Sequence, residues 1–461
     1  MKKLNALIIL GLFFVFLAGL SGCGENVTIV ATADLLGDNG QAALINTDEP
    51  DETPIIVDIV ENPSKILCSL DGTKAYVIGS ADDEFSVIDL MTKTSEFVDI
   101  EEHLLQTRRI WDMGLSADGS KLIVGTRPLL NYTSNIEIYD TASLELLGSF
   151  SISLNPLDPY RGRKLVVDPQ KEAIYVIATA LLGTVAQVRA FAFDGTVLDA
   201  GKPIDSDLLD LNNYDIAISP DGDLLLAVST KIFPFKVTDD GLEALNPIAG
   251  KGEGDNYKYY GKTKILFTKN YNMIYVNSAG LYIPGLCNIG GSCVCLDKQK
   301  ILNNDEDPFV FSLVDFVNDD LIKWIVGMLD ENIEDIIDPL QLYGIADSAI
   351  EGDTCYMVIA SVKSMAFDLT GLQGGKYILA IYKTLPLIGN IWIGGKVIDT
   401  YPNNIAVNPE KDSMVLSYFW KNKIDIFERN PLLRWLLTSS TQVDLNNYPW
   451  ALDMASVPLP E

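Results

Sequence analysis

The stretch YDIAISPDGDLLLAVS (residues 214–229) is the clearest copy of a unit that recurs along the chain. An apolar run over residues 214–219 is followed by Pro-Asp-Gly and by a second apolar run over residues 224–229. Proline sets φ for a tight turn, aspartate hydrogen-bonds the turn backbone and glycine accepts a positive φ, so the stretch predicts an antiparallel hairpin. Neither run alternates between apolar and polar residues, which predicts strands buried on both faces. A lone hairpin cannot bury both faces, so we expect neighbouring copies to cover it.

Similar hairpins recur along the chain. We expect their first strands over residues 65–69, 112–116, 164–168, 215–219, 264–268, 345–349 and 404–408. Each is followed by a turn, a second strand, a third strand that often ends on an acidic residue, and usually a short fourth strand. Four short strands at a period of roughly 45–60 residues are typical of the blades of a β-propeller. The sequence therefore predicts an all-β fold of this kind.

The two ends of the chain supply complementary parts of one blade. Residues 27–31, 42–46 and 55–60 fit second, third and fourth strands, and residues 450–456 fit the missing first strand. We expect this shared blade to close the ring and leave no exposed sheet edge. Counting it, the sequence predicts eight four-stranded blades. Seven is the alternative, if the stretch between residues 280 and 400 forms one blade rather than two.

One copy carries a resemblance to a known repeat. The segment DGTKAYV (residues 71–77), followed by SVID (residues 86–89), resembles the YVTN-type propeller repeat. The resemblance spans nearly the whole chain after the N-terminal segment, with degenerate copies from about residue 260 onward. It implies a propeller fold and says little about function.

The N-terminus reads as an export signal. A basic start, an apolar run over residues 4–20 and the small residues before Cys23 predict a signal peptide over residues 1–22. Leu-Ser-Gly-Cys (residues 20–23) resembles the bacterial lipobox, which implies that Cys23 carries fatty acyl chains such as palmitate and begins the mature protein. Because Gly24, rather than an aspartate, follows Cys23, the resemblance implies that a Gram-negative host would send the protein to the outer membrane. Residues 23–461 are then one propeller domain with an insertion at 302–341, and apolar spacing over 315–340 predicts one or two helices there.

Composition excludes several classes of function. The formal net charge of −29 argues against a nucleic-acid partner, because no basic excess is present to neutralise phosphates. His103 is the only histidine, which excludes a three-histidine metal centre, and its acidic surroundings favour a surface position. We expect no cofactor.

Five cysteines follow Cys23. Cys68 and Cys355 lie in or at the start of apolar strands and are interpreted as small core residues. Cys287, Cys293 and Cys295 share a glycine-rich segment, and in an oxidising compartment we expect one local disulfide among them. A metal site would need a fourth ligand that the sequence does not offer.

A candidate binding surface lies in the connections that enter the first strands. In a propeller these connections, and those between second and third strands, open on one face, called the top. The residues predicted to bind a ligand or partner there are Arg108, Arg109, Trp111, Arg127, Tyr160, Arg161, Arg163, Tyr214, Tyr260, Tyr343 and Trp450. Four of the eight arginines of the chain lie in two adjacent entry loops. Arg, Tyr and Trp commonly anchor binding surfaces; alternatively, the aromatics cap the blades and the arginines pair with nearby acids.

Charged residues form a second pattern at the first position of successive first strands, just inside the entry loops and at the expected mouth of the channel. The opening positions of successive first strands are Lys65, Asp112, Lys164, Asp215 and Lys264, after which the charge is lost at Ile345, Asn404 and Leu452. The favoured interpretation is a set of ion pairs between blades that offset the cost of desolvation. The alternative is a polar site that contacts a ligand.

Together these patterns predict a lipid-anchored binding or scaffold protein that presents its top face to a protein, peptide or glycan in the cell envelope. Because Val27 opens a second strand only four residues after Cys23, we expect the bottom face to lie toward the membrane. An alternative is an enzyme resembling propeller lactonases, with carboxylates and a divalent cation near the channel. A role in envelope assembly, by analogy with other lipid-anchored propellers, is a third possibility that rests on fold alone.

Overall fold

The computed structural model describes twenty-one stretches of the chain. They are residues 26–33, 40–79, 83–100, 108–128, 133–154, 160–180, 185–205, 214–249, 263–269, 272–278, 281–283, 287–289, 292–312, 343–361, 377–385, 389–398, 402–408, 413–418, 423–429, 437–445 and 450–458. Residues 1–22, expected to form a signal peptide, lie outside these residues, as do Cys23, His103, Tyr260 and the expected helices at 315–340.

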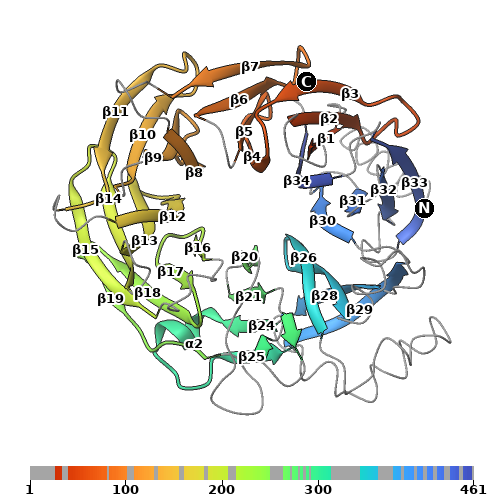
Figure 1. Cartoon of the computed structure of the whole chain (residues 1–461). Helices are drawn as coiled ribbons and strands as arrows, with labels where there is room; N and C mark the ends of the chain where they lie inside the picture. The colour runs from red at the N-terminus through yellow and green to blue at the C-terminus, as the bar shows by residue number, and fades with distance from the viewer. Residues whose placement is uncertain are drawn as a thin grey trace, which may run out of the picture.

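The prediction of an all-β propeller built from four-stranded antiparallel blades is confirmed (Figure 1). Within the described residues there are eight four-stranded sheets. Their innermost strands are β4 (Pro63–Cys68), β8 (Arg108–Leu115), β12 (Tyr160–Val167), β16 (Asp215–Ile218), β20 (Thr263–Phe267), β26 (Tyr343–Glu351), β30 (Pro402–Val407) and β34 (Trp450–Pro458). Each of these strands contacts the innermost strand of the next sheet, and β34 contacts β4, so the contacts form a closed ring.

The other strands follow in sequence outward from the channel. The second strands are β5 (Lys74–Gly79), β9 (Lys121–Pro128), β13 (Ala173–Ala180), β17 (Leu224–Val228), β21 (Met273–Ser278), β27 (Thr354–Ser361), β31 (Ser413–Tyr418) and β1 (Asn26–Ala33). The third strands are β6 (Glu84–Asp89), β10 (Asn135–Asp140), β14 (Ala186–Ala192), β18 (Ile232–Thr238), β24 (Ser292–Asp297), β28 (Tyr377–Leu385), β32 (Lys423–Arg429) and β2 (Gly40–Asn46). The outer strands are β7 (Thr94–Asp99), β11 (Leu146–Ser151), β15 (Val197–Ile204), β19 (Gly241–Ala244), β25 (Phe309–Ser312), β29 (Gly389–Ile398), β33 (Leu437–Asp444) and β3 (Ile55–Ile59).

Two small elements interrupt the sheet of β20, β21, β24 and β25. A two-stranded hairpin of β22 (Leu281–Ile283) and β23 (Cys287–Ile289) lies between its second and third strands. The short helix α2 (Lys298–Leu302) precedes its outer strand, with the side chain of Asp297 capping the helix N-terminus. The first part of the expected insertion at 302–341 therefore belongs to a blade, because β25 pairs with β24. No helix among the described residues is long and apolar enough to cross a membrane.

One sheet joins the two ends of the chain, as predicted. β34 pairs with β1 over the whole length of β1, from Asn26 opposite Pro458 to Ala33 opposite Trp450. The hydroxyls of Thr28 and Ser456, 2.6 Å apart, add a side-chain hydrogen bond across the junction. Antiparallel pairing of strands from opposite ends of the sequence leaves no free edge at which the ring could open.

The hairpin at residues 214–229 shows why the blades need one another. Gly222 has φ of 76°, the left-handed value that the turn requires. Every residue of β17 is buried. Leu225 and Ala227 pack in a cluster with the sheet of β12–β15, whereas Leu224, Leu226 and Val228 pack in a cluster with the sheet of β20 and β21. The prediction of burial on both faces is thus confirmed.

Three cysteines that the structure describes, Cys68, Cys295 and Cys355, are free thiols. Cys355 is fully buried and Cys68 packs at the edge of an apolar cluster. Cys295 is a buried free thiol, so the local disulfide expected among Cys287, Cys293 and Cys295 does not include it. Its strand β24 pairs with β21 and β25, which encloses this side chain within the sheet. The side chains of Cys287 and Cys293 are not among those that the structure describes.

Candidate functional site

A β-bulge recurs near the top end of the innermost strands. The pairing register shifts at this point in β4, β8, β12, β26, β30 and β34. A bulge bends its strand and redirects the neighbouring side chains. In β4, β8, β26 and β34 the bulge brings Lys65, Asp112, Asp347 and Asp453, respectively, to positions where they contact the next blade.

Four aspartates near the top ends of the innermost strands connect consecutive blades. Each accepts a hydrogen bond at Oδ2 from a backbone N–H of the next innermost strand. The pairs are Asp112 with Leu165 (2.9 Å), Asp215 with Ile265 (3.0 Å), Asp347 with Ile405 (3.0 Å) and Asp453 with Ile66 (2.7 Å). The four contacts repeat at every second blade around the ring.

Lysines of the intervening blades reach these aspartates. Lys65 Nζ lies 2.6 Å from Asp112 Oδ1 and donates a hydrogen bond to Met113 O at 2.7 Å. Lys264 Nζ makes the same two contacts one half-turn away, with Asp347 Oδ1 at 3.1 Å and Ser348 O at 2.6 Å. The ion-pair interpretation therefore describes the geometry of both contacts.

The predicted loss of charge after Lys264 is wrong. The bulges place Asp347 and Asp453 in the ring, where the sequence pattern pointed to Ile345 and Leu452. In order, the ring residues are Lys65, Asp112, Lys164, Asp215, Lys264, Asp347, Asn404 and Asp453. Aspartate thus occupies every second blade, and Asn404 is the one uncharged member of this set. Such an alternation closes on itself only in a ring with an even number of blades.

The carboxyl groups of this ring differ in their electrostatics. Burial acts to raise the pKa of Asp112, but the charges of Lys65 and Lys164 hold that pKa below its usual value. Burial dominates at Asp215 and raises its pKa to about 6, because the partial relief from Lys164 is insufficient. Burial acts to lower the pKa of Lys264, but its ion pair with Asp347 and the charges of Asp453 and Asp215 together raise that pKa. Of the two carboxyl groups, Asp215 is thus the one whose burial is less well compensated.

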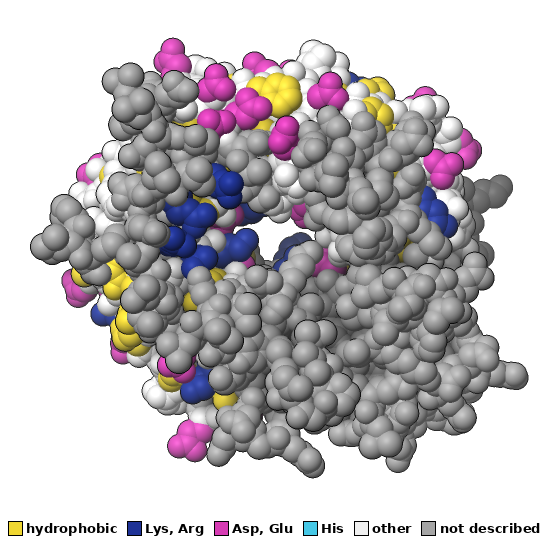
Figure 2. All heavy atoms as spheres, in the orientation of Figure 1, with side chains coloured by type: hydrophobic (Ala, Val, Ile, Leu, Met, Phe, Trp, Pro, Cys, Tyr) yellow, Lys and Arg dark blue, Asp and Glu magenta, His cyan; other side chains and the backbone are white. Residues whose placement is uncertain are grey.

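Four of the predicted binding residues form a compact group, which we call the arginine quartet: Arg109, Arg127, Arg161 and Arg163. Arg109 on β8 lies directly opposite Arg127 on β9, and both strands contact β12, which carries the other two. All four are half-buried. Burial lowers the pKa of Arg127, and the positive charges of Arg161, Arg163 and Arg109 lower it further. Figure 2 shows Lys and Arg side chains gathered beside the central opening, over these strands.

Trp111 packs between two of the strands that carry the arginine quartet. Its indole packs where a Cβ on Gly125 of β9 or on Gly162 of β12 would come within 2.4 Å and 2.3 Å of the ring, respectively. Its Nε1–H donates to Thr126 O at 3.1 Å. Because only glycine leaves room for the indole at both positions, Trp111 fixes β9 against β12. This half-buried residue, predicted to contact a ligand, thus has a packing role.

The other predicted aromatic residues are placed differently. Tyr160 is buried, with the Arg189 guanidinium carbon 3.9 Å from its ring centroid, and Tyr214 is buried in an apolar cluster. Arg108, Tyr343 and Trp450 lie on β8, β26 and β34, but their side chains are outside the description. Sequence position alone could not separate these packing roles from binding, since Arg189 and Gly162 are distant from their partners along the chain.

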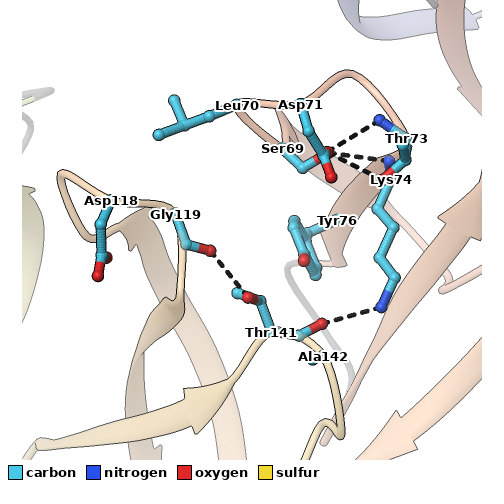
Figure 3. Close-up of a pocket in the computed structure, with 10 residues that line it drawn as sticks. All are labelled: Ser69, Leu70, Asp71, Thr73, Lys74, Tyr76, Asp118, Gly119, Thr141 and Ala142. Atoms are coloured by element: carbon cyan, nitrogen blue, oxygen red, sulfur yellow. Dashed lines mark hydrogen bonds between the residues drawn. The ribbon is translucent and has the colours of Figure 1, made fainter. Parts of the chain in front are cut away.

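A separate pocket of about 380 Å³ opens at the opposite face, between the hairpin turns of two neighbouring sheets (Figure 3). Its polar groups are largely used by the turns themselves. Asp71 accepts hydrogen bonds from Ser69 Oγ and Thr73 N, and Lys74 Nζ donates to Thr141 O at 2.9 Å. Burial raises the pKa of the Tyr76 hydroxyl, which lines the pocket, to about 12. Across the described part of the chain, no group of three His, Cys, Asp or Glu side chains is placed to hold a metal ion.

The chain matches no family model, and no curated protein matches its sequence. Solved structures are similar to it in fold. Dihydro-heme d1 dehydrogenase NirN in complex with DHE gives a TM-score of 0.55 at 12% identity, covering 92% of this chain and 75% of that one. Apo AztD from Citrobacter koseri gives 0.54 at 10% identity, covering 94% and 98%. The periplasmic gluconolactonase PpgL from Pseudomonas aeruginosa gives 0.50 at 11% identity, covering 94% and 99%. At these identities the similarity establishes the β-propeller fold.

Proposed function

We propose that the chain is a lipid-anchored binding protein of the bacterial cell envelope, which recognises its ligand or partner with the arginine quartet on its top face. The observation that carries the proposal is the concentration of four half-buried arginines on two neighbouring blades of a protein whose net charge is −29. A rigid closed ring supports them, and preorganised arginines are frequent anchors of binding surfaces.

The anchor in this proposal rests on the sequence around Cys23. Asn26, where β1 begins, lies three residues later, and three residues span at most about 10 Å. β1 begins at the end of the blade that is remote from the arginine quartet, since it is a second strand. The lipid would therefore hold the bottom face near the membrane and direct the quartet away from it.

Photo-crosslinking in envelope fractions tests this proposal. A probe at the top face of the wild type should capture a species that Arg109→Glu/Arg161→Glu loses. Lys171→Glu serves as the matched control, because Lys171 is exposed on a bottom-face turn, where it pairs with Asp239 at 3.0 Å. Equal capture by the wild type and both variants would remove the quartet from partner binding. Cell fractionation tests the lipid anchor. We expect the Cys23→Ser variant, but not the wild type, in the soluble fraction.

A second candidate, a lactonase-like hydrolase, is favoured by one observation. Burial raises the pKa of Asp215, at the channel mouth, to about 6, which suits a general base near neutral pH. A panel of lactones assayed with wild type and Asp215→Asn decides this candidate. Turnover that is lost in the variant supports it, and no turnover by the wild type rejects it for those substrates.

A further inference from the structure

We infer that the pocket between the sheets of β4–β7 and β8–β11 binds a neutral, polyhydroxylated ligand of the monosaccharide or disaccharide kind. The pocket lies on the face opposite the arginine quartet, so the inference goes beyond the proposed function and does not depend on it. Three observations carry it: a buried hydroxyl without a hydrogen-bond partner, charged groups of both signs around the pocket, and a volume that suits a small molecule.

The first observation concerns a tyrosine that recurs as the third residue of second strands. Tyr175 of β13 donates a hydrogen bond to Asp168 Oδ2 at 2.9 Å, and Tyr356 of β27 donates to Glu351 Oε2 at 3.3 Å. Both acids lie at the same place in their sheets, opposite the first residue of the second strand. Tyr76 of β5 is fully buried as well, but its hydroxyl makes no hydrogen bond with the residues that the structure describes.

A change of residue in the turn before β5 explains this difference. The residue at the place of the acid is Ser69, whose Oγ donates to Asp71 Oδ1 at 2.6 Å. The Thr141 hydroxyl, which lies near enough to influence the pKa of Tyr76, donates to Gly119 O at 2.8 Å. Figure 3 shows the Tyr76 ring in the middle of the residues that line the pocket. Because a buried donor without a partner costs free energy, a ligand oxygen that accepts from Tyr76 would gain more than a single exposed hydrogen bond.

The second observation, the charged groups around the pocket, restricts the charge of the ligand. The hydrogen bond from Ser69 lowers the pKa of Asp71, and the hydrogen bond from Ser116 lowers that of Asp118 to about 2, so both carboxylates are ionised at neutral pH. They repel an anion. Lys74 Nζ, which donates to a backbone carbonyl of the neighbouring turn at 2.9 Å, repels a cation. A ligand of either sign therefore meets like charge in this pocket, whereas a neutral ligand does not.

Hydroxyl groups match these partners, because each hydroxyl both donates and accepts hydrogen bonds. One would accept from Tyr76 or from Lys74, whose ammonium group has three hydrogens to donate. Another would donate to Asp71 Oδ2, because the turn uses the other oxygen of that carboxylate. Leu70, which lines the pocket and is 67% exposed, offers an apolar contact to the C–H face of a sugar ring. The third observation, a volume of about 380 Å³, falls within the range of about 300–1,000 Å³ that is typical of small-molecule sites.

Thermal unfolding of two matched variants tests the state of the Tyr76 hydroxyl. Tyr76→Phe removes a buried hydroxyl that has no partner, so without ligand this variant should unfold at the same temperature as the wild type or at a higher one. Tyr175→Phe removes the donor to the buried Asp168 Oδ2 and should unfold at a lower temperature. If Tyr76→Phe were destabilised as much as Tyr175→Phe, the hydroxyl would already be paired and the inference would fail.

Titration of the purified full chain by calorimetry and ligand-observed NMR tests the site itself. The neutral probes are glucose, N-acetylglucosamine and maltose, and glucuronate and glucosamine are the charged counterparts of glucose. We expect saturable binding of at least one neutral probe, weakened roughly threefold to tenfold in Tyr76→Phe, as the loss of one hydrogen bond predicts. Lys74→Met should weaken the same binding, whereas Tyr175→Phe should leave it unchanged. The charged counterparts should bind more weakly than glucose.

A second arm distinguishes a free sugar from a sugar carried by a lipid. Phosphatidylcholine vesicles with and without glucosylceramide replace the soluble probes, and binding to the glucosylceramide vesicles alone would assign the ligand to a membrane surface. Three outcomes would overturn the inference. They are no saturable binding of any neutral probe in either form, binding that is unchanged in both Tyr76→Phe and Lys74→Met, and tighter binding of glucuronate or glucosamine than of glucose.

Discussion

Lys65 Nζ and Asp112 Oδ1, 2.6 Å apart, join the innermost strands of two neighbouring blades at the mouth of the channel. The Asp112 side chain is 2% exposed and that of Lys65 is 32% exposed, so the pair has one buried member and one that reaches solvent. Asp112 also accepts backbone hydrogen bonds from Met113 and from Leu165 of the following blade. A single carboxylate thereby connects three consecutive sheets.

Removing the lysine of this pair should destabilise the ring. Lys65→Met leaves the Asp112 carboxylate buried with less compensation, and we expect the free energy of unfolding to fall by roughly 1–3 kcal/mol. Because the pKa of Asp112 is lowered in the folded state, its contribution is present above its ordinary pKa and lost as the pH falls below that value. The stability difference between wild type and variant should therefore shrink in acid. Denaturant unfolding between pH 3 and pH 7 measures both effects, with the exposed Lys236→Met as control; equal losses in the two variants would contradict the prediction.

The contribution of Asp215 to stability should depend on pH in the opposite sense to that of Asp112. Its pKa is raised by burial to about 6, so the wild type loses stability at this residue as the pH rises through 6. Asp215→Asn keeps an oxygen that accepts the hydrogen bond from Ile265 N and removes the charge. We expect the variant to be more stable than wild type at pH 8, by up to about 3 kcal/mol, and equal to it near pH 4. Unfolding curves at the two pH values decide this, and a variant that is less stable at pH 8 would refute it.

The sequence pattern predicted the ring of sheets because its signals are local. Turns such as that at Gly222 and runs such as β17 carry their own chemistry, and the repeat positions the innermost strands with little need of long-range information. The bulges in β26 and β34 are different, because a shift of pairing depends on the partner strand. For this reason the sequence could not reveal that Asp347 and Asp453, rather than Ile345 and Leu452, continue the charged ring.

The arginine quartet could also be predicted from the sequence, because the blade repeat is regular. Its members lie where strands enter from the top face, and the blade topology brings these positions together. The role of Trp111 was not accessible, since it depends on two glycines, Gly125 and Gly162, that belong to other strands. A glycine inside a predicted strand signals a close approach of another group, but it does not identify that group.

The thiol of Cys295 should be unreactive in the folded protein. Burial raises its pKa to about 12, so only about one thiol in ten thousand is ionised at pH 8. Iodoacetamide should label Cys295 slowly in native protein and rapidly after unfolding in denaturant, as peptide mass spectrometry would show. Cys68, whose pKa burial also raises to about 12, should behave alike. A disulfide-linked peptide that contains Cys295 would contradict this prediction and the free thiol seen in the structure.

Gly125 should be intolerant of even the smallest side chain. A Cβ at this position would lie 2.4 Å from Trp111 Cε2, so Gly125→Ala must displace the indole or separate β9 from β12. Overpacking of this kind costs typically about 1–3 kcal/mol, and we expect the melting temperature to fall and tryptophan emission to shift to longer wavelength as the indole moves. Gly148→Ala on the exposed outer strand β11 is the matched control, because a Cβ there meets nothing within 4 Å. It should leave stability unchanged or slightly higher, since alanine loses less backbone entropy than glycine on folding. If Gly125→Ala were as stable as Gly148→Ala, the wedge would not fix the two strands, and the positioning of the arginine quartet would need another explanation.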